Sequence, residues 1–123
     1  RSSIRNIPIH PDLLPIVERM KASSKDGYLI PSPAGNKYGI RSDFLSKAFG
    51  RLKTSMGFNE QYVFHSIRGT VITLLQRADV PETTSKCITG HDVGDVHNDV
   101  YSDGASPKQK YEAIRKLNYN FEE

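Results

Sequence analysis

Four side chains in the second half of the chain could together handle a phosphate group. His65 and Arg68 are three residues apart, so both can project from one face at the start of a helix. His91 follows Gly90, and glycine is a residue type that commonly ends helices. His91 comes 26 residues after His65, and Tyr101 comes 10 residues after His91. Each pair is common by itself, so the hypothesis depends on the spacing of the whole set.

The chemistry that suits this set is phosphoryl transfer without a metal ion. The planar guanidinium of Arg68 can bind two non-bridging phosphate oxygens. A histidine can donate to a phosphate oxygen or carry a proton near neutral pH. An activated tyrosine hydroxyl can be a nucleophile. The set therefore predicts transfer through a phosphotyrosine intermediate, in which positioning and charge stabilisation supply most of the catalysis.

Helices are expected to position these residues. Apolar side chains recur at helical spacing over much of the chain, with cap and stop residues at the ends. We expect Ser42 to cap a helix that Gly57 ends. The expected helices cover residues 11–22, 42–57, 66–77, 81–90 and 94–101, and a last one starts at Ser106-Pro107.

A small β element near the N-terminus completes the predicted fold. Ile7 and Ile9 alternate with other residue types around Pro8, which is typical of an edge strand. Residues 28–30 indicate a second short strand. The predicted fold class is therefore mainly α with a small β element, an α+β arrangement. The length of 123 residues predicts a single domain, 1–123.

Composition and charge narrow the class of protein. Hydrophobic residues make up 37% of the chain and charged residues 25%, which excludes a disordered protein. Apolar runs are short and Cys87 is the single cysteine, so we expect a cytoplasmic protein without a membrane partner. The net charge is +3, with ten Lys or Arg against five Asp or Glu in residues 1–62. This basic first half is typical of a surface that binds the phosphates of nucleic acid, and it also fits the solvated face of an ordinary basic protein.

The stretch from His65 to Tyr101 resembles the active-site block of the tyrosine recombinases, the phage-integrase family. In that family a His-x-x-Arg motif opens a helix, and a Leu-Gly-His box and a tyrosine follow at similar separations. Residues 3–11 resemble the segment after the family's β-hairpin, and residues 101–119 resemble prophage and genomic-island integrases. The matching runs of the active-site block are His65-Ser66-Ile67-Arg68-Gly69-Thr70, Ile88-Thr89-Gly90-His91 and Val100-Tyr101.

The resemblance implies a tyrosine-recombinase catalytic-domain fold and site-specific DNA recombination or integration. Tyr101 would attack the scissile phosphate and form a 3′-phosphotyrosyl link, releasing a 5′-hydroxyl. Arg68 would be the second of the family's two catalytic arginines, His65 would handle a proton, and His91 would hydrogen-bond a non-bridging oxygen. Arg68, His91 and Lys86 would contact double-stranded DNA at attachment sites, where the full-length protein would act as a homo-oligomer. No cofactor and no metal ion are implied.

The sequence also departs from the family pattern. Thr89 stands where the family's box usually has Leu, and Ser66 stands where Asp is common. The family's first arginine and its hairpin lysine normally lie upstream of the region where this sequence begins. Arg5 lies too close to the expected strand to be a clear substitute, and Lys37 does not match the hairpin lysine. We therefore expect the chain to be the C-terminal two-thirds of a catalytic domain, without the arm-binding and core-binding domains and inactive by itself.

One alternative stays open. The chain could be a non-catalytic helical DNA-binding or interaction module, a decayed prophage integrase remnant. Such a remnant has no need to keep His65, Arg68, His91 and Tyr101 together. The four histidines do not predict a zinc site, because no His-x-x-x-His or Cys-x-x-Cys spacing is present and Cys87 is the single cysteine.

Overall fold

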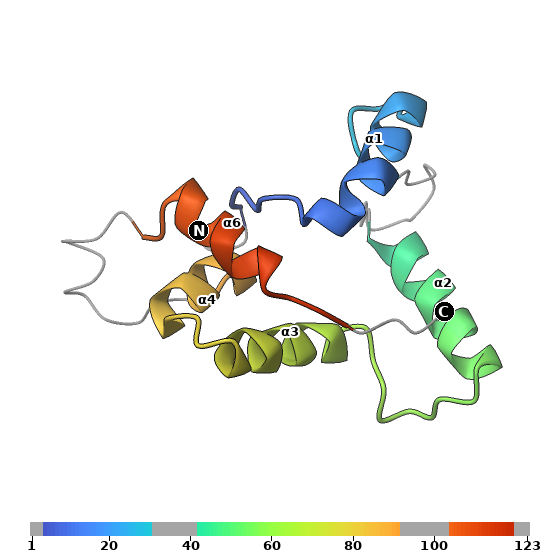
Figure 1. Cartoon of the computed structure of the whole chain (residues 1–123). Coiled ribbons are helices and arrows are strands. Elements are labelled where there is room, and N and C mark those ends of the chain that lie inside the picture. Colours follow the sequence, from blue (N-terminus) through green and yellow to red (C-terminus); the bar gives the residue numbers. More distant parts are fainter. Residues whose placement is uncertain (1–3, 31–41, 92–103, 120–123) are drawn as a thin grey trace. The chain divides into compact units, whose positions relative to one another are not determined.

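The computed structural model describes residues 4–30, 42–91 and 104–119, and these residues are mainly helical (Figure 1). A short 3-10 helix, η1, precedes the first α-helix. The predicted helices over 11–22, 42–57, 66–77 and 81–90 and from residue 106 are confirmed, whereas the one over 94–101 lies outside the described residues. The described helices are η1 (Pro11–Leu13), α1 (Leu14–Ser23), α2 (Asp43–Ser55), α3 (Ser66–Arg77), α4 (Glu82–Thr89) and α6 (Pro107–Arg115).

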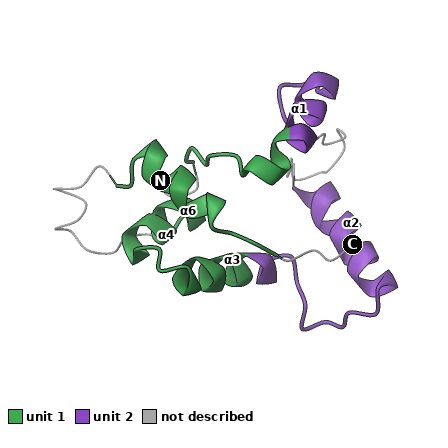
Figure 2. Cartoon of the chain, viewed as in Figure 1, with its two compact units in different colours: residues 1–14, 68–123 green, residues 15–67 purple. Residues whose placement is uncertain are grey.

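The chain divides into two compact units, which Figure 2 shows in different colours. Unit 1 combines the N-terminal residues 1–14 with residues 68–123, and unit 2 comprises residues 15–67. The boundary falls within the first turn of α3, between Ile67 and Arg68. Each unit has its own internal packing.

Unit 1 has a small apolar core in which α4 packs against α6. Leu75, near the end of α3, is completely buried. Val71, Ala78 and Leu117 pack against the core from positions that are partly buried. Burying one aliphatic side chain contributes about 1.5–3 kcal/mol, so these few residues hold the unit together. The buried core residues are Leu75, Val80, Ile88, Ala113 and Ile114.

The turn after α3 places two of these residues in the core. Asp79 has a left-handed backbone, with φ 60°. Its N–H donates to the carbonyl oxygen of Gln76 (3.1 Å), and the N–H of Val80 donates to that of Leu75 (3.0 Å). This hydrogen-bond pair is the Schellman arrangement, which brings together the apolar residues on either side of a helix end. Leu75 and Val80 are both buried, so the turn itself contributes to the core.

Helix α6 begins with a complete capping box. The Ser106 hydroxyl oxygen accepts from the N–H of Gln109 (3.1 Å), and Gln109 Oε1 accepts from the N–H of Ser106 (2.8 Å). Pro107 is the first helical residue, where its missing N–H removes no helical hydrogen bond. The predicted start at Ser106-Pro107 is therefore confirmed.

The predicted strand in the N-terminal segment is wrong, because residues 4–10 form no strand. A strand needs a second strand to complete its ladder, and the described residues contain none. Polar groups of the segment bond to helices instead. Arg5 Nε donates to the carbonyl oxygen of Ile88 in α4 (2.7 Å), and Lys110 Nζ in α6 donates to the carbonyl oxygen of Asn6 (2.9 Å).

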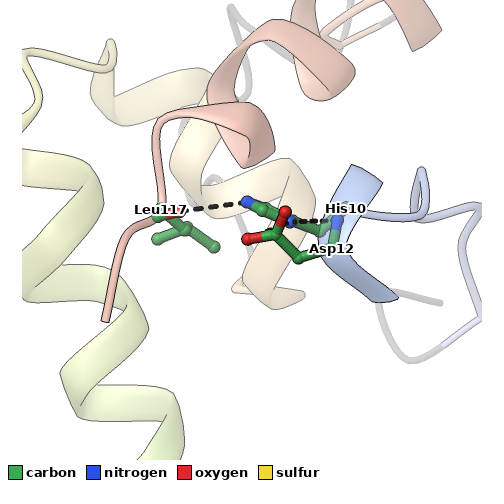
Figure 3. Close-up of polar contacts among 3 residues, drawn as sticks. All are labelled: His10, Asp12 and Leu117. Atoms are coloured by element: carbon green, nitrogen blue, oxygen red, sulfur yellow. Dashed lines mark hydrogen bonds and ion pairs between the residues drawn. The ribbon is translucent and has the colours of Figure 1, made fainter. Parts of the chain in front are cut away.

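His10 joins the N-terminal segment to the residues that follow α6 (Figure 3). Its Nδ1 accepts from the N–H of Asp12 (3.0 Å) and so caps η1. Its Nε2 lies 3.0 Å from the carbonyl oxygen of Leu117. Because a carbonyl oxygen can only accept, Nε2 carries the proton in this arrangement. The side chain is only 16% exposed, so the ring links two parts of unit 1 that are distant in sequence.

Aromatic pairs organise the described part of unit 2. Neither α1 nor α2 contains a buried residue. The rings of Phe49 and Phe64 meet edge to face, with centroids 5.1 Å apart. The rings of Phe58 and Tyr62 have the same separation. Such pairs contribute about 0.5–1.5 kcal/mol beyond the area that they bury. No residue in the described part of unit 2 is fully buried, in contrast to the core of unit 1.

Two further predictions are wrong in unit 2. The Ser42 side chain makes no capping hydrogen bond, because its backbone has helical angles (φ −77°, ψ −9°) instead of the extended ones that capping requires. Residues 28–30 form no strand. Local side chains bind the Tyr28 backbone instead: its N–H donates to Asp26 Oδ1 (3.0 Å), and its carbonyl oxygen accepts from the Ser24 hydroxyl (2.7 Å).

Candidate functional site

His91 stands directly after the glycine that ends α4. Gly90 has a left-handed backbone, with φ 80°, which glycine adopts without a steric penalty. The N–H groups of Gly90 and His91 both donate to the carbonyl oxygen of Lys86, at 2.8 and 3.2 Å. The backbone of His91 is therefore fixed to the last turn of α4, while the residue itself is exposed.

The side chain of His91 is held by the residue two positions before it. Thr89 is 6% exposed, and its hydroxyl donates to the carbonyl oxygen of Ser85 (2.9 Å). The same hydroxyl oxygen lies 3.0 Å from His91 Nδ1. One nitrogen of the imidazole is thus fixed against a buried hydroxyl. In the sequence, Thr89 is only a departure from the family's Leu. A hydroxyl residue directly before a Gly-His pair that ends a helix is the feature that could have predicted this contact.

Arg5 reaches the same end of α4 from the N-terminal segment. Its Nε donates to the carbonyl oxygen of Ile88, which precedes His91 by less than one helical turn. A cation at a helix C-terminus interacts favourably with the exposed carbonyl groups and the helix dipole. The sequence pattern assigns Arg5 no role at this site. The contact spans 83 residues, so no local pattern indicates it.

Arg68 lies in the first turn of α3 and is half-buried. His65 is exposed and precedes the helix, which begins at Ser66. The Ser66 hydroxyl accepts from the N–H of Val63 (3.1 Å) and so organises the entry into α3. Arg68 and His91 belong to unit 1, and His65 belongs to unit 2.

Tyr101, the predicted nucleophile, lies outside the described residues. The convergence of all four predicted catalytic side chains therefore stays a prediction. What the structure provides is the local setting of three of them: a loop residue before α3, a residue in its first turn, and a residue just after α4.

Lys86, a predicted DNA contact, forms an ion pair one helical turn back along α4. Its Nζ lies 3.2 Å from Glu82 Oε1, and the Lys86 side chain is 33% exposed. A pair of this kind on a helix surface contributes about 0.3–0.5 kcal/mol. The pair is weak enough for a phosphate oxygen to replace the carboxylate as the partner of Lys86.

Unit 2 carries most of the excess positive charge, with eight Lys or Arg against four Asp or Glu. Helix α2 contributes Lys47, Arg51 and Lys53. Lys47 pairs with Asp43 (2.8 Å), and Lys53 donates to the carbonyl oxygen of Asn59 (2.9 Å). The basic first half of the sequence therefore corresponds largely to one structural unit.

Metal ligands do not gather anywhere in residues 4–30, 42–91 and 104–119, where no group of three His, Cys, Asp or Glu side chains could hold an ion. Over the same ranges, no helix combines the length and the apolar character that crossing a bilayer requires. The chain matches no protein-family model, no curated protein and no solved structure.

Proposed function

We propose that the chain is the C-terminal part of the catalytic domain of a tyrosine recombinase, which cleaves and rejoins DNA. The Tyr101 hydroxyl oxygen attacks the scissile phosphorus, and its proton passes to a histidine. The bond from phosphorus to the 5′-oxygen breaks, and that oxygen leaves as a hydroxyl after it takes a proton from a general acid, the role of the family's upstream hairpin lysine. The 3′-phosphotyrosyl link is later attacked by the 5′-hydroxyl of another strand, which restores a phosphodiester and frees Tyr101.

The observation that carries this proposal is the spacing of His65, Arg68, His91 and Tyr101. The local geometry supports it in two ways. Arg68 stands in the first turn of a helix and is half-buried. His91 is exposed, but its backbone and one ring nitrogen are both fixed. Pre-positioned groups of this kind are what phosphoryl transfer requires, because most of its catalysis is positioning and charge stabilisation.

The charge of the chain supports DNA as the substrate. The eight basic residues of unit 2 can neutralise backbone phosphates of a DNA duplex. Arg5 and Lys86 add positive charge at the end of α4 that carries His91. Contacts of this kind orient a duplex without reading its sequence.

A covalent-trapping experiment tests the proposal. The chain is incubated with a duplex that carries a 5′-bridging phosphorothiolate at the scissile position, and the protein–DNA adduct is measured on a denaturing gel. A thiolate leaves without an acid, so the reaction does not depend on the family's upstream hairpin lysine. We expect adduct on this substrate and little or none on an ordinary phosphodiester, because loss of a general acid costs about 10²–10⁴-fold in rate.

The matched control is Tyr101→Phe, which removes the nucleophilic oxygen and nothing else. Adduct that persists in Tyr101→Phe contradicts the assignment of Tyr101 as the nucleophile. Duplex binding without adduct on the phosphorothiolate contradicts catalysis and supports the alternative, a DNA-binding module that has lost the reaction.

A further inference from the structure

The Thr89 hydroxyl makes two polar contacts with a single proton. Its oxygen lies 2.9 Å from the carbonyl oxygen of Ser85 and 3.0 Å from His91 Nδ1. A carbonyl oxygen has no proton to give, so the hydroxyl must donate to Ser85. The hydroxyl oxygen must then accept from Nδ1, which therefore carries a proton.

We infer that Thr89 is a positioning residue that holds neutral His91 with its proton on Nδ1 and its lone pair on Nε2. Hydrogen bonds at the two ring nitrogens decide which of them carries the proton in a neutral histidine. A partner that can only accept from one nitrogen keeps the proton on that nitrogen. Free histidine in water favours the opposite form, with the proton on Nε2. Buried Thr89 is thus the feature that reverses the preference at this position.

The backbone around the contact keeps the hydroxyl and the ring in register. Thr89 closes α4, and the left-handed Gly90 turns the chain so that His91 returns toward the helix end. The His91 N–H donates to the carbonyl oxygen of Lys86 (3.2 Å), which fixes the backbone from which the imidazole extends. The distance between Thr89 and the imidazole therefore depends on the helix end and not on a flexible loop.

This assignment defines what His91 can do, and that part of the inference rests on the proposed function. While the ring is neutral, Nε2 carries no proton and cannot donate to the phosphate. Once Nε2 is protonated, both nitrogens donate: Nδ1 to Thr89, and Nε2 to a non-bridging oxygen of the reacting phosphate. Thr89 thus makes the donor role of His91 depend on protonation of Nε2. A leucine at position 89 has no hydroxyl and could not impose this dependence.

Two substitutions at position 89 separate the hydroxyl from the shape of the side chain. Thr89→Val keeps the branched shape in the buried site and removes the hydroxyl. Thr89→Ser keeps the hydroxyl and removes a methyl group. The Ser85 carbonyl also belongs to the hydrogen-bond ladder of α4, so Thr89→Val leaves it with a partner.

Nitrogen-15 NMR of the imidazole side chains tests the inference directly. In mildly alkaline buffer, where an ordinary imidazole is neutral, the wild-type His91 resonances should show a protonated Nδ1 and an unprotonated Nε2. Thr89→Ser should retain this pattern and Thr89→Val should move the proton to Nε2. Exposed His65 serves as the internal reference and should not change. A wild-type His91 with its proton on Nε2 overturns the inference, whatever the activity of the chain.

The same variants are then tested for phosphorothiolate adduct. We expect Thr89→Val to lower the rate about tenfold to a hundredfold, as is common when the partner that orients a functional histidine is removed, and Thr89→Ser to restore most of it. Adduct at the wild-type rate in Thr89→Val overturns the positioning role. Absence of adduct in wild type, with the proton found on Nδ1, instead contradicts the proposed function and leaves the assignment at Thr89 in place.

Discussion

The guanidinium of Arg68 is the side chain on which the proposed chemistry depends most. Arg68→Ala should lower adduct formation by about 10²–10³-fold, the usual cost of one fixed donor to a developing negative charge. Arg68→Lys should also be poor, since an ammonium group cannot form a two-pronged contact with two oxygens. Adduct rates are measured by denaturing gel and folding by circular dichroism.

Arg77→Ala is the matched control, because Arg77 is an exposed arginine at the other end of the same helix. It should leave the adduct rate unchanged. Equal losses in the two variants would mean that general positive charge, and not a specific contact of Arg68, explains the effect.

His10 links the N-terminal segment of unit 1 to the residues after α6, so its removal should lower the stability of unit 1. Its ring caps η1 through Asp12 and reaches the carbonyl oxygen of Leu117. His10→Ala loses both contacts and should lower the free energy of unfolding by about 1–3 kcal/mol. His10→Ser can still cap η1 but cannot reach Leu117, so it should fall between wild type and His10→Ala in urea denaturation. Equal stability of the two variants would show that the Leu117 contact carries the whole effect.

At the scale of the helix, Gly90 both ends α4 and places His91. Gly90→Ala imposes a side chain on a left-handed backbone, which costs about 1–2 kcal/mol. We expect this loss of stability together with a lower adduct rate, because a relaxed backbone moves His91 away from Thr89.

Gly57→Ala provides the comparison. Gly57 ends α2 with φ 88°, and no heavy atom outside the local chain lies within 4 Å of the position of an added Cβ. The backbone strain at the two glycines is therefore the same in kind. Gly57→Ala should lose similar stability and keep its adduct rate. If Gly57→Ala also lowers the adduct rate, the lower rate of Gly90→Ala is explained by lost stability and not by movement of His91.

The packing of α4 against α6 should account for much of the stability of unit 1. Ile114 is 5% exposed and belongs to the core cluster. Ile114→Ala should cost about 2–5 kcal/mol, the range for truncating a buried aliphatic side chain. Leu52 in α2 is 58% exposed, so Leu52→Ala should change the urea midpoint little. A large loss in Leu52→Ala would mean that another surface covers α2 in solution.

At the scale of the whole molecule, the uneven charge predicts how DNA binding responds to salt. Binding through backbone phosphates releases counterions, so the affinity should fall at least about tenfold between roughly 50 and 200 mM salt, with little dependence on sequence. Fluorescence anisotropy with two unrelated duplexes measures both properties. An affinity that is flat over this range, or strong preference for one duplex, would contradict the prediction.

Two arginine variants test which unit contacts the DNA phosphates. Arg51→Ala removes a charge from α2 in the basic unit 2 and should reduce the salt slope by about one. Arg115 in unit 1 lies 3.4 Å from Glu112 Oε1 and 5.7 Å from the centre of the Tyr111 ring. Because Arg115 is already engaged within its own helix, Arg115→Ala should leave the slope unchanged.

The sequence by itself determined the helices that the structure describes and the spacing of the candidate catalytic residues. The start of α6 at Ser106-Pro107 and the end of α4 at Gly90 follow from hydrogen bonds between residues that are close along the chain. Such bonds need no distant partner, so residue type and periodicity are enough to predict them. Ser42 is the exception, because its backbone angles prevented the cap that its residue type favours.

Tertiary structure alone decided the path of the N-terminal segment and the contact of Arg5 with the end of α4. The alternation around Pro8 forms a strand only if another strand lies beside it. In the described residues no strand is present, and the segment bonds to α4 and α6 instead. The contacts of Arg5 with Ile88 and of His10 with Leu117 span 83 and 107 residues. Separations of that length leave no periodic signal, because they depend on how the helices pack and not on the residues near either partner.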